Sequence, residues 1–352
     1  MYKKALFYVM SGTGNSYRAS VWAQEEAEKN GIEVKNIPIE RAKVKTEVEN
    51  GKENIVGLFC PTHGFTAPWG MIAFVLKMPQ VKGTHAFISA CRAGWLLGPW
   101  YLPGLEGTTA LLLATILMFK GYNIRGTMGL DMPSNWLVVH WGLTRPHTDR
   151  YVEKGRQKIK KIFGEVLEGK RKYVGWIYVA LGILLIPVSL GYLLVGRFML
   201  SKVMFADDRC NSCGICADNC PFKAIVMKGK KNPRPYWTFK CESCERCIAY
   251  CPKKAIQGAY LYLIVLYWFM FSLKPQFITV VMTGYLVHLG WAKDMALSVI
   301  EIAYNIAFVA VTYPLLFMMA RVPILNKLFF YTTPTAIYRR YNEPETKLRD
   351  MK

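Results

Sequence analysis

Short β-type runs alternate with helical stretches over residues 3–168. Their periodicity predicts strands at residues 5–10, 33–37, 54–60, 85–90 and 123–130, and helices at residues 15–30, 68–77, 106–120 and 149–168. The apolar stretch 110–119 is too short to span a bilayer and is expected to be a buried helix. This alternation is typical of βαβ units around a mostly parallel sheet, so we expect an α/β domain over residues 1–168.

A second pattern follows, in which long apolar runs carry almost no charge. Residues 173–196 form a run of 24 residues without a charged side chain, and at about 1.5 Å per residue a helix of that length covers a bilayer core of about 30 Å. Residues 258–273, 275–291 and 295–320 are also strongly apolar. We expect a basic linker with a membrane segment over residues 169–205, membrane helices over 258–330 and a basic tail over 331–352.

Composition and charge narrow the class of protein. Of the 352 residues 52% are hydrophobic and 20% are charged, which excludes an intrinsically disordered chain. Lys and Arg number 45 against 24 Asp and Glu, a formal net charge of +21. Nucleic acid and the anionic face of a membrane both attract such a chain, but the apolar runs with basic flanks favour the membrane. We therefore expect membrane lipid, and no nucleic acid, as a partner.

Eight of the ten cysteines fall in two copies of the pattern C-x2-C-x2-C-x3-C, each followed by proline. Bacterial-type ferredoxins hold two 4Fe-4S clusters with this spacing, and the fourth cysteine of each run ligates the other cluster. The alternative, a pair of zinc sites, fits the third cysteine and the Cys-Pro ending poorly. We expect an α+β two-cluster ferredoxin domain over residues 206–257, with one cluster on Cys210, Cys213, Cys216 and Cys251 and a second on Cys241, Cys244, Cys247 and Cys220.

A glycine-rich loop joins the first expected strand to the first expected helix. Its backbone N–H groups and hydroxyls suit a phosphate, and it consists of Ser11, Gly12, Thr13, Gly14, Asn15 and Ser16. The loop lacks the lysine of a Walker A motif, and Tyr17 stands where a dinucleotide-binding loop has its third glycine. A phosphate monoester held by neutral donors is the ligand that remains.

This loop resembles the first loop of flavodoxins, T/S-x-T-G-x-T/S, which grips the FMN phosphate in a doubly wound sheet of order 2-1-3-4-5. The resemblance implies that the loops after the third and fourth strands flank the isoalloxazine. Those loops supply Thr62, His63, Gly64 and Trp69, and Cys91, Arg92, Ala93, Gly94 and Trp95. Trp69 and Trp95 are alternative stacking rings, and each is as readily a core aromatic. Cys60 and Cys91 are more readily buried small residues than redox partners.

Together the two sets of motifs resemble flavodoxin-ferredoxin fusion proteins over residues 1–168 and 207–258. Residues 132–136, Met-Pro-Ser-Asn-Trp, also resemble a segment of these fusions, which either closes over the flavin or is an ordinary loop. The apolar runs depart from the pattern of a soluble electron carrier. The insertion at residues 95–105 is a further candidate membrane contact.

The combination predicts a membrane-bound electron-transfer flavoprotein with FMN and two 4Fe-4S clusters. One hypothesis makes it an oxidoreductase that reduces a quinone or an unsaturated isoprenoid lipid. Its weak candidate proton donors are His288 and Glu301, because ionisable residues at membrane depth are costly, although both could simply lie at helix ends. The alternative is a non-enzymatic module that passes electrons from a soluble low-potential donor to a separate membrane reductase.

The cofactors also constrain the topology. FMN and oxygen-labile clusters are normally loaded in the cytoplasm, so we expect both redox domains on the cytoplasmic side of the cell membrane. Residues 173–196 then cannot cross the bilayer a single time. We expect this segment to break at Pro187 and either to return as a re-entrant hairpin or to lie in the interface.

Overall fold

The computed structural model describes residues 2–43, 47–97, 100–138, 140–269, 284, 286 and 292–351. The chain divides into two units, each assembled from segments far apart in the sequence. Unit 1 comprises Met1–Leu193, Cys244–Tyr250 and Arg339–Lys352, and unit 2 comprises Leu194–Ser243 and Cys251–Tyr338. The boundaries expected after residues 257 and 330 both lie inside unit 2, and the expected ferredoxin domain, residues 206–257, is divided because Cys244–Tyr250 belongs to unit 1.

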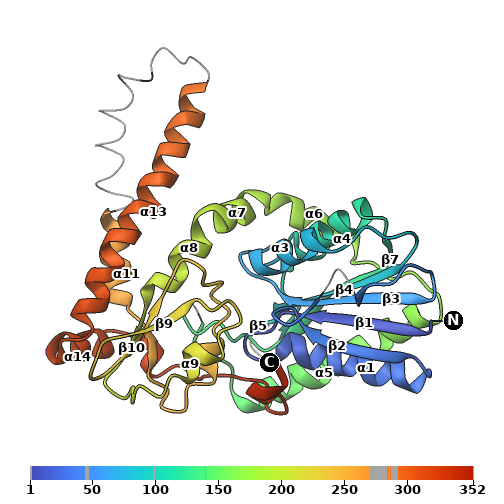
Figure 1. Cartoon of the computed structure of the whole chain (residues 1–352), viewed down its shortest axis with the longest axis horizontal. Helices are drawn as coiled ribbons and strands as arrows, with labels where there is room; N and C mark the ends of the chain where they lie inside the picture. Colours follow the sequence, from blue (N-terminus) through green and yellow to red (C-terminus); the bar gives the residue numbers. More distant parts are fainter. Residues whose placement is uncertain are drawn as a thin grey trace. The chain divides into compact units, whose positions relative to one another are not determined.

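Unit 1 is built around a five-stranded parallel sheet of order β2-β1-β3-β4-β7 (Figure 1). Its strands are β1 (Lys4–Val9), β2 (Glu33–Pro38), β3 (Asn54–Pro61), β4 (His85–Ala93) and β7 (Asn123–Met132). The central strand β3 is apolar and buried on both faces, as a parallel sheet covered by helices requires. The order is that of the expected flavodoxin-like doubly wound sheet, which is thereby confirmed.

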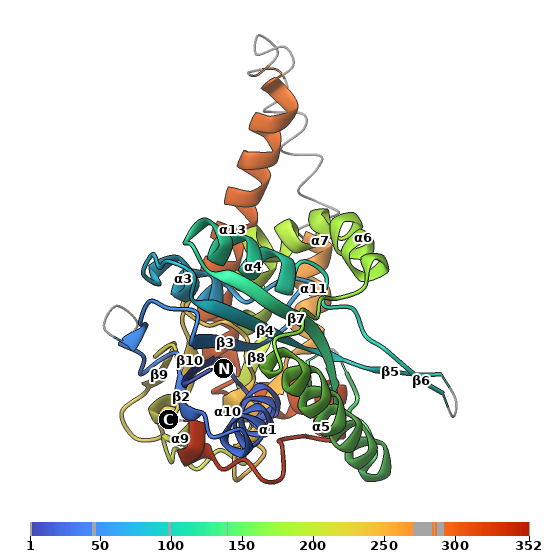
Figure 2. The same cartoon turned by 90° about the vertical axis from the view of Figure 1, so that its right-hand side faces the viewer.

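Helices cover both faces of this sheet (Figure 2). One face carries α1 (Asn15–Lys29) and α5 (Arg145–Leu167), and the other carries α3 (Trp69–Lys77) and α4 (Thr109–Phe119). Trp22 of α1 and Phe163 of α5 join the main core against the strands. Helix α4, expected to be buried, is buried on one side only, because Leu113 is fully buried whereas Phe119 is 84% exposed.

A short antiparallel hairpin leaves the end of β4, in residues for which no strand was expected. It consists of β5 (Trp95–Leu97) and β6 (Trp100–Leu102) and extends away from the sheet (Figure 2). Tyr101 anchors the hairpin by packing edge-on against Tyr151 of α5. Trp95 and Trp100 are more than 60% exposed, so the hairpin presents two indole rings to its surroundings.

The helical segment after α5 is interrupted at Leu185 and does not run unbroken from Trp176. Helix α6 (Trp176–Leu184) ends before α7 (Ile186–Gly191), and Pro187 lies in the first turn of α7, where its missing N–H has no partner to lose. The break therefore falls just ahead of the proline. The helices pack on unit 1, where the Ser189 hydroxyl donates to the Phe65 carbonyl (3.0 Å) and the Arg92 guanidinium lies 4.6 Å from the Tyr178 ring centroid.

Unit 2 begins with a small α+β region. Two antiparallel ribbons pair β8 (Met204–Ala206) with β11 (Ile256–Gly258) and β9 (Ile225–Lys228) with β10 (Arg234–Trp237), and α9 (Ile215–Asp218) lies in the first cysteine motif. The helices α11 (Tyr260–Trp268), α13 (Lys293–Met319) and α14 (Pro323–Tyr331) follow. The region agrees with the expected ferredoxin-like fold.

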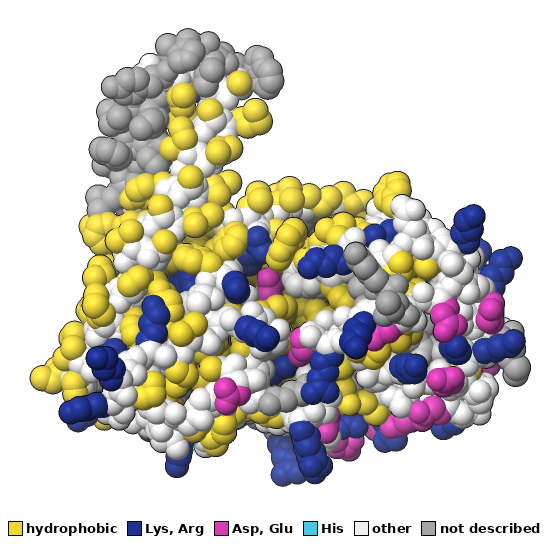
Figure 3. Space-filling view, viewed as in Figure 1, with side chains coloured by type: hydrophobic (Ala, Val, Ile, Leu, Met, Phe, Trp, Pro, Cys, Tyr) yellow, Lys and Arg dark blue, Asp and Glu magenta, His cyan; other side chains and the backbone are white. Residues whose placement is uncertain are grey.

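Two helical stretches of the described chain are long and apolar enough to cross a membrane, at Ile186–Val203 and Lys293–Met319. Hydrophobic side chains line α6 and α7 in unit 1 and α13 in unit 2 (Figure 3). Apart from Gly284 and Leu286, the span expected at residues 275–291 lies outside the described residues. The same holds for His288.

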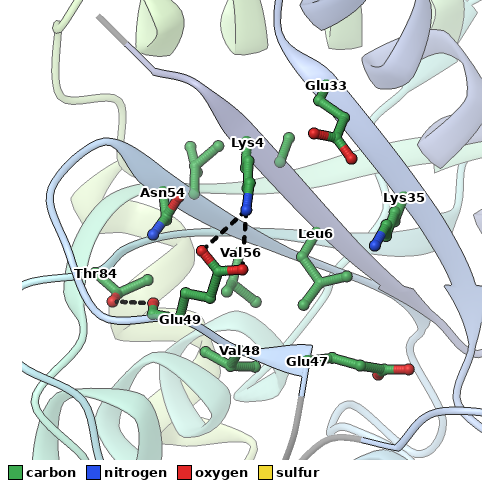
Figure 4. Close-up of a pocket in the computed structure, with 12 residues that line it drawn as sticks. Lys4, Leu6, Glu33, Lys35, Glu47, Val48, Glu49, Asn54, Val56 and Thr84 are labelled. Carbon is green, nitrogen blue, oxygen red and sulfur yellow. Dashed lines mark hydrogen bonds and ion pairs between the residues drawn. The ribbon is translucent and has the colours of Figure 1, made fainter.

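A small pocket of unit 1 lies at the amino ends of the strands. Lys4, Glu33 and Asn54 are among its lining residues, and the Lys4 ammonium pairs with the Glu49 carboxylate at 2.9 Å (Figure 4). Ligands of open α/β sheets bind at the opposite, carboxyl edge. This pocket is therefore not the expected cofactor site.

Candidate cofactor sites

The glycine-rich loop, residues 11–16, joins β1 to α1 at the carboxyl edge of the sheet. All four of its polar side chains are buried, and Gly14 has φ of 102°, a conformation that favours glycine. The Ser11 hydroxyl accepts the Gly14 N–H at 3.2 Å. The loop thus has the strand-loop-helix setting that the phosphate interpretation needs.

The segment after β7 closes on this loop. Asn15 donates through Nδ2 to the Pro133 carbonyl (3.1 Å), and the Asn135 side-chain amide contacts the Thr13 hydroxyl. Trp136 follows, with its ring parallel to that of His63 (5° between planes, centroids 6.2 Å apart). The Trp136 Nε1–H is buried and has no acceptor in the part of the chain that the structure describes, which is costly unless a ligand supplies one.

His63 also meets a residue that the sequence did not single out. The Tyr192 hydroxyl lies 3.3 Å from His63 Nδ1, and the two rings meet edge to face. A Cβ on Gly64 would lie 2.4 Å from the Tyr192 Cβ, so the loop after β3 and the end of α7 are in close contact. Tyr192 was missed because it lies in a run whose apolar character indicated a membrane segment.

The end of β4 and the loop after it supply five of the residues that the resemblance placed at the flavin. Cys91 is buried in the main core, and burial raises the pKa of its thiol to about 12, so it is unreactive. Gly94 packs against the Tyr151 ring, Ala93 is exposed and Trp95 lies in the exposed hairpin. The structure brings none of these side chains to the His63–Trp136 pair. Trp69 begins α3 and is 40% exposed, and its role as a stacking ring stays a prediction.

Arg92, also expected at the flavin, is part of a buried ion-pair cluster. Its Nε and Nη2 donate to the Asp131 carboxylate at 2.9 and 3.2 Å, and its Nη1 contacts the Glu106 carboxylate. Burial by itself lowers the pKa of Arg92, but the two acids outweigh it and raise the pKa. Arg92 therefore joins β4 to β7.

We expect Arg92→Met to lower the free energy of unfolding by about 3–5 kcal/mol, because Glu106 would be left buried without its counterion and Asp131 would keep only Lys158, 3.6 Å away. Urea denaturation of the detergent-solubilised protein measures this loss. Arg145→Met is the matched control, since Arg145 is 93% exposed and lies 3.9 Å from Asp149. Equal stability of the two variants would contradict a stabilising role for the Arg92 cluster.

Part of the second cysteine motif, Cys244–Tyr250, packs on the glycine-rich loop within unit 1. A Cβ on Gly12 would lie 1.7 Å from the Cys244 carbonyl oxygen and 3.1 Å from the Cys244 Cβ. The Arg246 guanidinium donates to the Ser11 carbonyl at 2.7 Å. The cysteine motif and the phosphate loop are therefore in van der Waals contact.

Glu245 connects the same motif to the segment that carries Trp136. Its carboxylate accepts the backbone N–H groups of Leu137 (2.6 Å) and Val138 (3.3 Å). Burial raises the pKa of Glu245 to about 8, and these two donors oppose the rise. Glu245 and Arg246 were not predicted as site residues, because the variable positions inside a cysteine motif give no signal of their own.

The four cysteines of the first predicted cluster line one pocket of unit 2. Cys251, from the second motif, shares it with Cys210, Cys213 and Cys216. The pKa of Cys216 is raised to about 12, mainly by burial and further by its three neighbours. Four crowded sulfurs need a cationic metal centre to exist as thiolates, so the donor set fits an iron-sulfur cluster.

The other four cysteines are divided between the units, with Cys220 and Cys241 in unit 2 and Cys244 and Cys247 in unit 1. Within unit 2, Cys220 Sγ accepts the Ala224 N–H at 3.2 Å and Cys241 Sγ accepts the Ser243 N–H at 3.4 Å. Such donors stabilise thiolate ligands. That these four hold a second cluster stays a prediction from their spacing. Glu301 lies within α13 of unit 2, and its catalytic role also stays a prediction.

One comparison with known proteins identifies the region that holds the cysteine motifs. The model of the 4Fe-4S dicluster domain family matches residues 209–256. The search of curated proteins gave no match. Among solved structures, a flavodoxin from the domain Archaea is 13% identical over 47% of this chain and 99% of its own, with a TM-score of 0.32.

Two further solved structures also align with about half of the chain. A Streptococcus pneumonia TIGR4 flavodoxin is 12% identical over 45% of this chain and 97% of its own, with a TM-score of 0.29. Rubredoxin oxygen:oxidoreductase from Desulfovibrio gigas is 20% identical over 47% of this chain and 37% of its own, with a TM-score of 0.27. Because these identities are at most 20% and these TM-scores are at most 0.32, we assign the fold of unit 1 from its strand order alone.

Proposed function

We propose that this chain, which joins a flavodoxin-like domain to a 4Fe-4S dicluster domain, is a membrane-bound flavoprotein that moves electrons between FMN and two 4Fe-4S clusters. One observation carries the proposal. Cys244, a predicted cluster ligand, packs against Gly12 of the predicted FMN phosphate loop, where not even a methyl group would fit. Two cofactors held by touching loops are placed for direct electron exchange.

The residues that would hold FMN come from three loops at the carboxyl edge of the sheet. Residues 11–16 would take the phosphate, and His63 and Trp136 would take the ring between parallel faces. A flavin ring between them would stack at about 3.5 Å from each face, so the His63 and Trp136 rings would need to be about 7 Å apart. Their centroids are 6.2 Å apart, so the two rings would have to separate by about 1 Å. The unpaired Trp136 Nε1–H lies in the plane of the indole, so it would serve a group at the edge of the stack, such as the ribityl chain, and not the stacked ring itself. When bound, FMN exchanges electrons in pairs or singly, and each cluster passes one at a time.

The acceptor in our proposal is a lipid-soluble molecule, a quinone or an unsaturated isoprenoid lipid. The apolar surface of unit 1 supports this choice of acceptor. One side of α6 and α7 packs on the domain, and the other side is exposed. Trp176 and Leu184 are more than 70% exposed, and such surfaces mark membrane contact on a folded domain. Helices that lie in the membrane interface without crossing the bilayer would also leave both redox domains on the cytoplasmic side, as expected.

The alternative is an electron-delivery module that serves a separate membrane reductase. It needs the same cofactors and the same membrane surface, so cofactor content does not separate the two. Only turnover by the isolated chain does.

Anaerobic purification from detergent-extracted membranes tests the proposal. We expect one FMN and about eight iron atoms per chain, in the membrane fraction. With a chemical reductant, oxidation by a short-chain quinone in the absence of other proteins would support the enzyme, whereas reduction of the cofactors without quinone turnover would support the module. Protein that is free of flavin and iron after anaerobic reconstitution would contradict both.

A further inference from the structure

A basic tail was expected over residues 331–352, and the part of it from Arg339 on is folded into unit 1. We call residues 339–351 the strap. Glu343 and Met351 are 1% exposed, and Thr346 is 2% exposed, so the strap is held by buried side chains. Its end is a turn of 3-10 helix, Leu348–Met351.

The strap contacts the glycine-rich loop through both backbone and side chains. The Glu343 N–H donates to the Thr13 carbonyl at 2.8 Å, and the Tyr341 hydroxyl donates to Asn15 Oδ1 at 2.9 Å. A Cβ on Gly14 would lie 2.7 Å from the Glu343 Cβ and 3.1 Å from the Thr346 Cβ. The strap is therefore packed against the loop without an intervening layer.

Asn15 is fixed from two sides by this arrangement. Tyr341 donates to its Oδ1, while its Nδ2 donates to the Pro133 carbonyl in the segment that carries Trp136. Its side-chain amide thus has one fixed orientation. Because Asn15 opens α1 beside the predicted phosphate, fixing it also fixes the first turn of the helix whose N–H groups face the anion.

The strap also determines the charge next to the loop. Arg18 in the first turn of α1 pairs through Nε with Glu343 (3.0 Å) and through Nη1 with Glu345 (3.1 Å). The Thr346 hydroxyl donates to the same Glu343 carboxylate at 2.5 Å. Both acids of the strap pair with Arg18, so its guanidinium is engaged by the strap and the donors left for a phosphate are the neutral ones of the loop.

At its other contacts the strap reaches the cysteine motif. The Tyr250 hydroxyl donates to the Thr346 carbonyl at 3.0 Å, and Arg340 Nη1 donates to the Ile248 carbonyl at 3.2 Å. The strap therefore contacts both the predicted phosphate loop and the segment that carries Cys244 and Cys247. A free basic tail would make neither contact.

We propose that the strap is the outer wall of the FMN phosphate site, in which Tyr341 and Glu343 are positioning residues for Asn15 and for the Thr13 backbone. The inference rests on the proposed function, because it assumes that the loop binds FMN. The strap would act on affinity by holding the loop in its binding conformation before the ligand arrives. Its effect should then be confined to ligands that carry the phosphate.

The test compares FMN with riboflavin, which lacks the phosphate, on full-length protein from which flavin has been removed with the clusters retained. Quenching of flavin fluorescence gives both Kd values. We expect Tyr341→Phe to raise the Kd for FMN about 3- to 10-fold, the loss of one hydrogen bond, with the Kd for riboflavin unchanged. Lys347→Ala, an exposed position of the strap, is the control and should bind both as the wild type does.

A second variant, truncated after Tyr338, removes the whole strap and should raise the Kd for FMN by more than tenfold. Unchanged FMN binding by Tyr341→Phe, or an equal loss of riboflavin binding, would overturn the proposal. Tighter FMN binding by either variant would also overturn it, because the strap would then compete with the phosphate. Wild-type protein that binds neither flavin would instead overturn the proposed function, and the strap proposal with it.

Discussion

Gly12→Ala should strip the protein of FMN and disturb the cysteine motif that packs on the phosphate loop. The new methyl group would lie 1.7 Å from the Cys244 carbonyl oxygen and 2.7 Å from its carbonyl carbon, both of which are backbone atoms. Neither side can yield by a simple side-chain rotation. Overpacking of this kind costs about 3 kcal/mol, which corresponds to a loss of about a hundredfold in FMN affinity.

Fluorescence titration with FMN and iron analysis of the same preparation measure both effects. Gly164→Ala is the matched control, because its new methyl group would have no atom nearer than 3.5 Å, the Glu26 carboxylate oxygen. It replaces glycine within α5 and should slightly stabilise the fold. A Gly12→Ala protein with wild-type FMN affinity and iron content would show that the two loops do not touch.

Cys251→Ala should remove one cluster, and that cluster should be the one ligated by the first cysteine motif. Cys251 lies in the second motif but lines the same pocket as Cys210, Cys213 and Cys216. We therefore expect the iron content to fall by about half, from about eight atoms per chain. Cys60→Ala is the control, because Cys60 is buried in unit 1 and should leave the iron content unchanged.

The double variant Cys216→Ala/Cys251→Ala separates the two possible assignments. If both cysteines serve one cluster, the second substitution adds nothing and about half of the iron remains. If each motif served its own cluster, the double variant would lose both. Iron analysis with low-temperature electron paramagnetic resonance distinguishes a protein with one intact cluster from one with none.

Local sequence patterns predicted the scaffold well. The strands of the central sheet and the helices on its faces were expected within a few residues, because each is a continuous periodic run. The exception is the hairpin of β5 and β6, whose three-residue strands are too short to give a periodic signal. The break before Pro187 was also predicted, because a proline limits where a helix can continue.

Candidate site residues were predicted only from local motifs. The cysteine spacing and the glycine-rich loop are contiguous motifs, so each could be recognised from its own residues, and the structure places the loop between β1 and α1 as expected. Arg92 was assigned to the cofactor, but its partners Glu106 and Asp131 are distant in sequence and revealed its structural role only in the fold. Tyr341, which contacts Asn15, lies 326 residues away from it along the chain. Such contacts follow from tertiary packing, which no single sequence window contains.

In the function we propose, flavin and an iron-sulfur cluster lie next to each other in one chain. Flash photolysis tests it most directly: a light pulse reduces the flavin of anaerobic holoprotein, and the cluster absorbance is followed in time. We expect the cluster to be reduced as the flavin is reoxidised, in a first-order process whose rate constant does not change with protein concentration. A rate constant that rises in proportion to protein concentration, or a flavin that keeps its electron, would show that the flavin and the cluster are not neighbours.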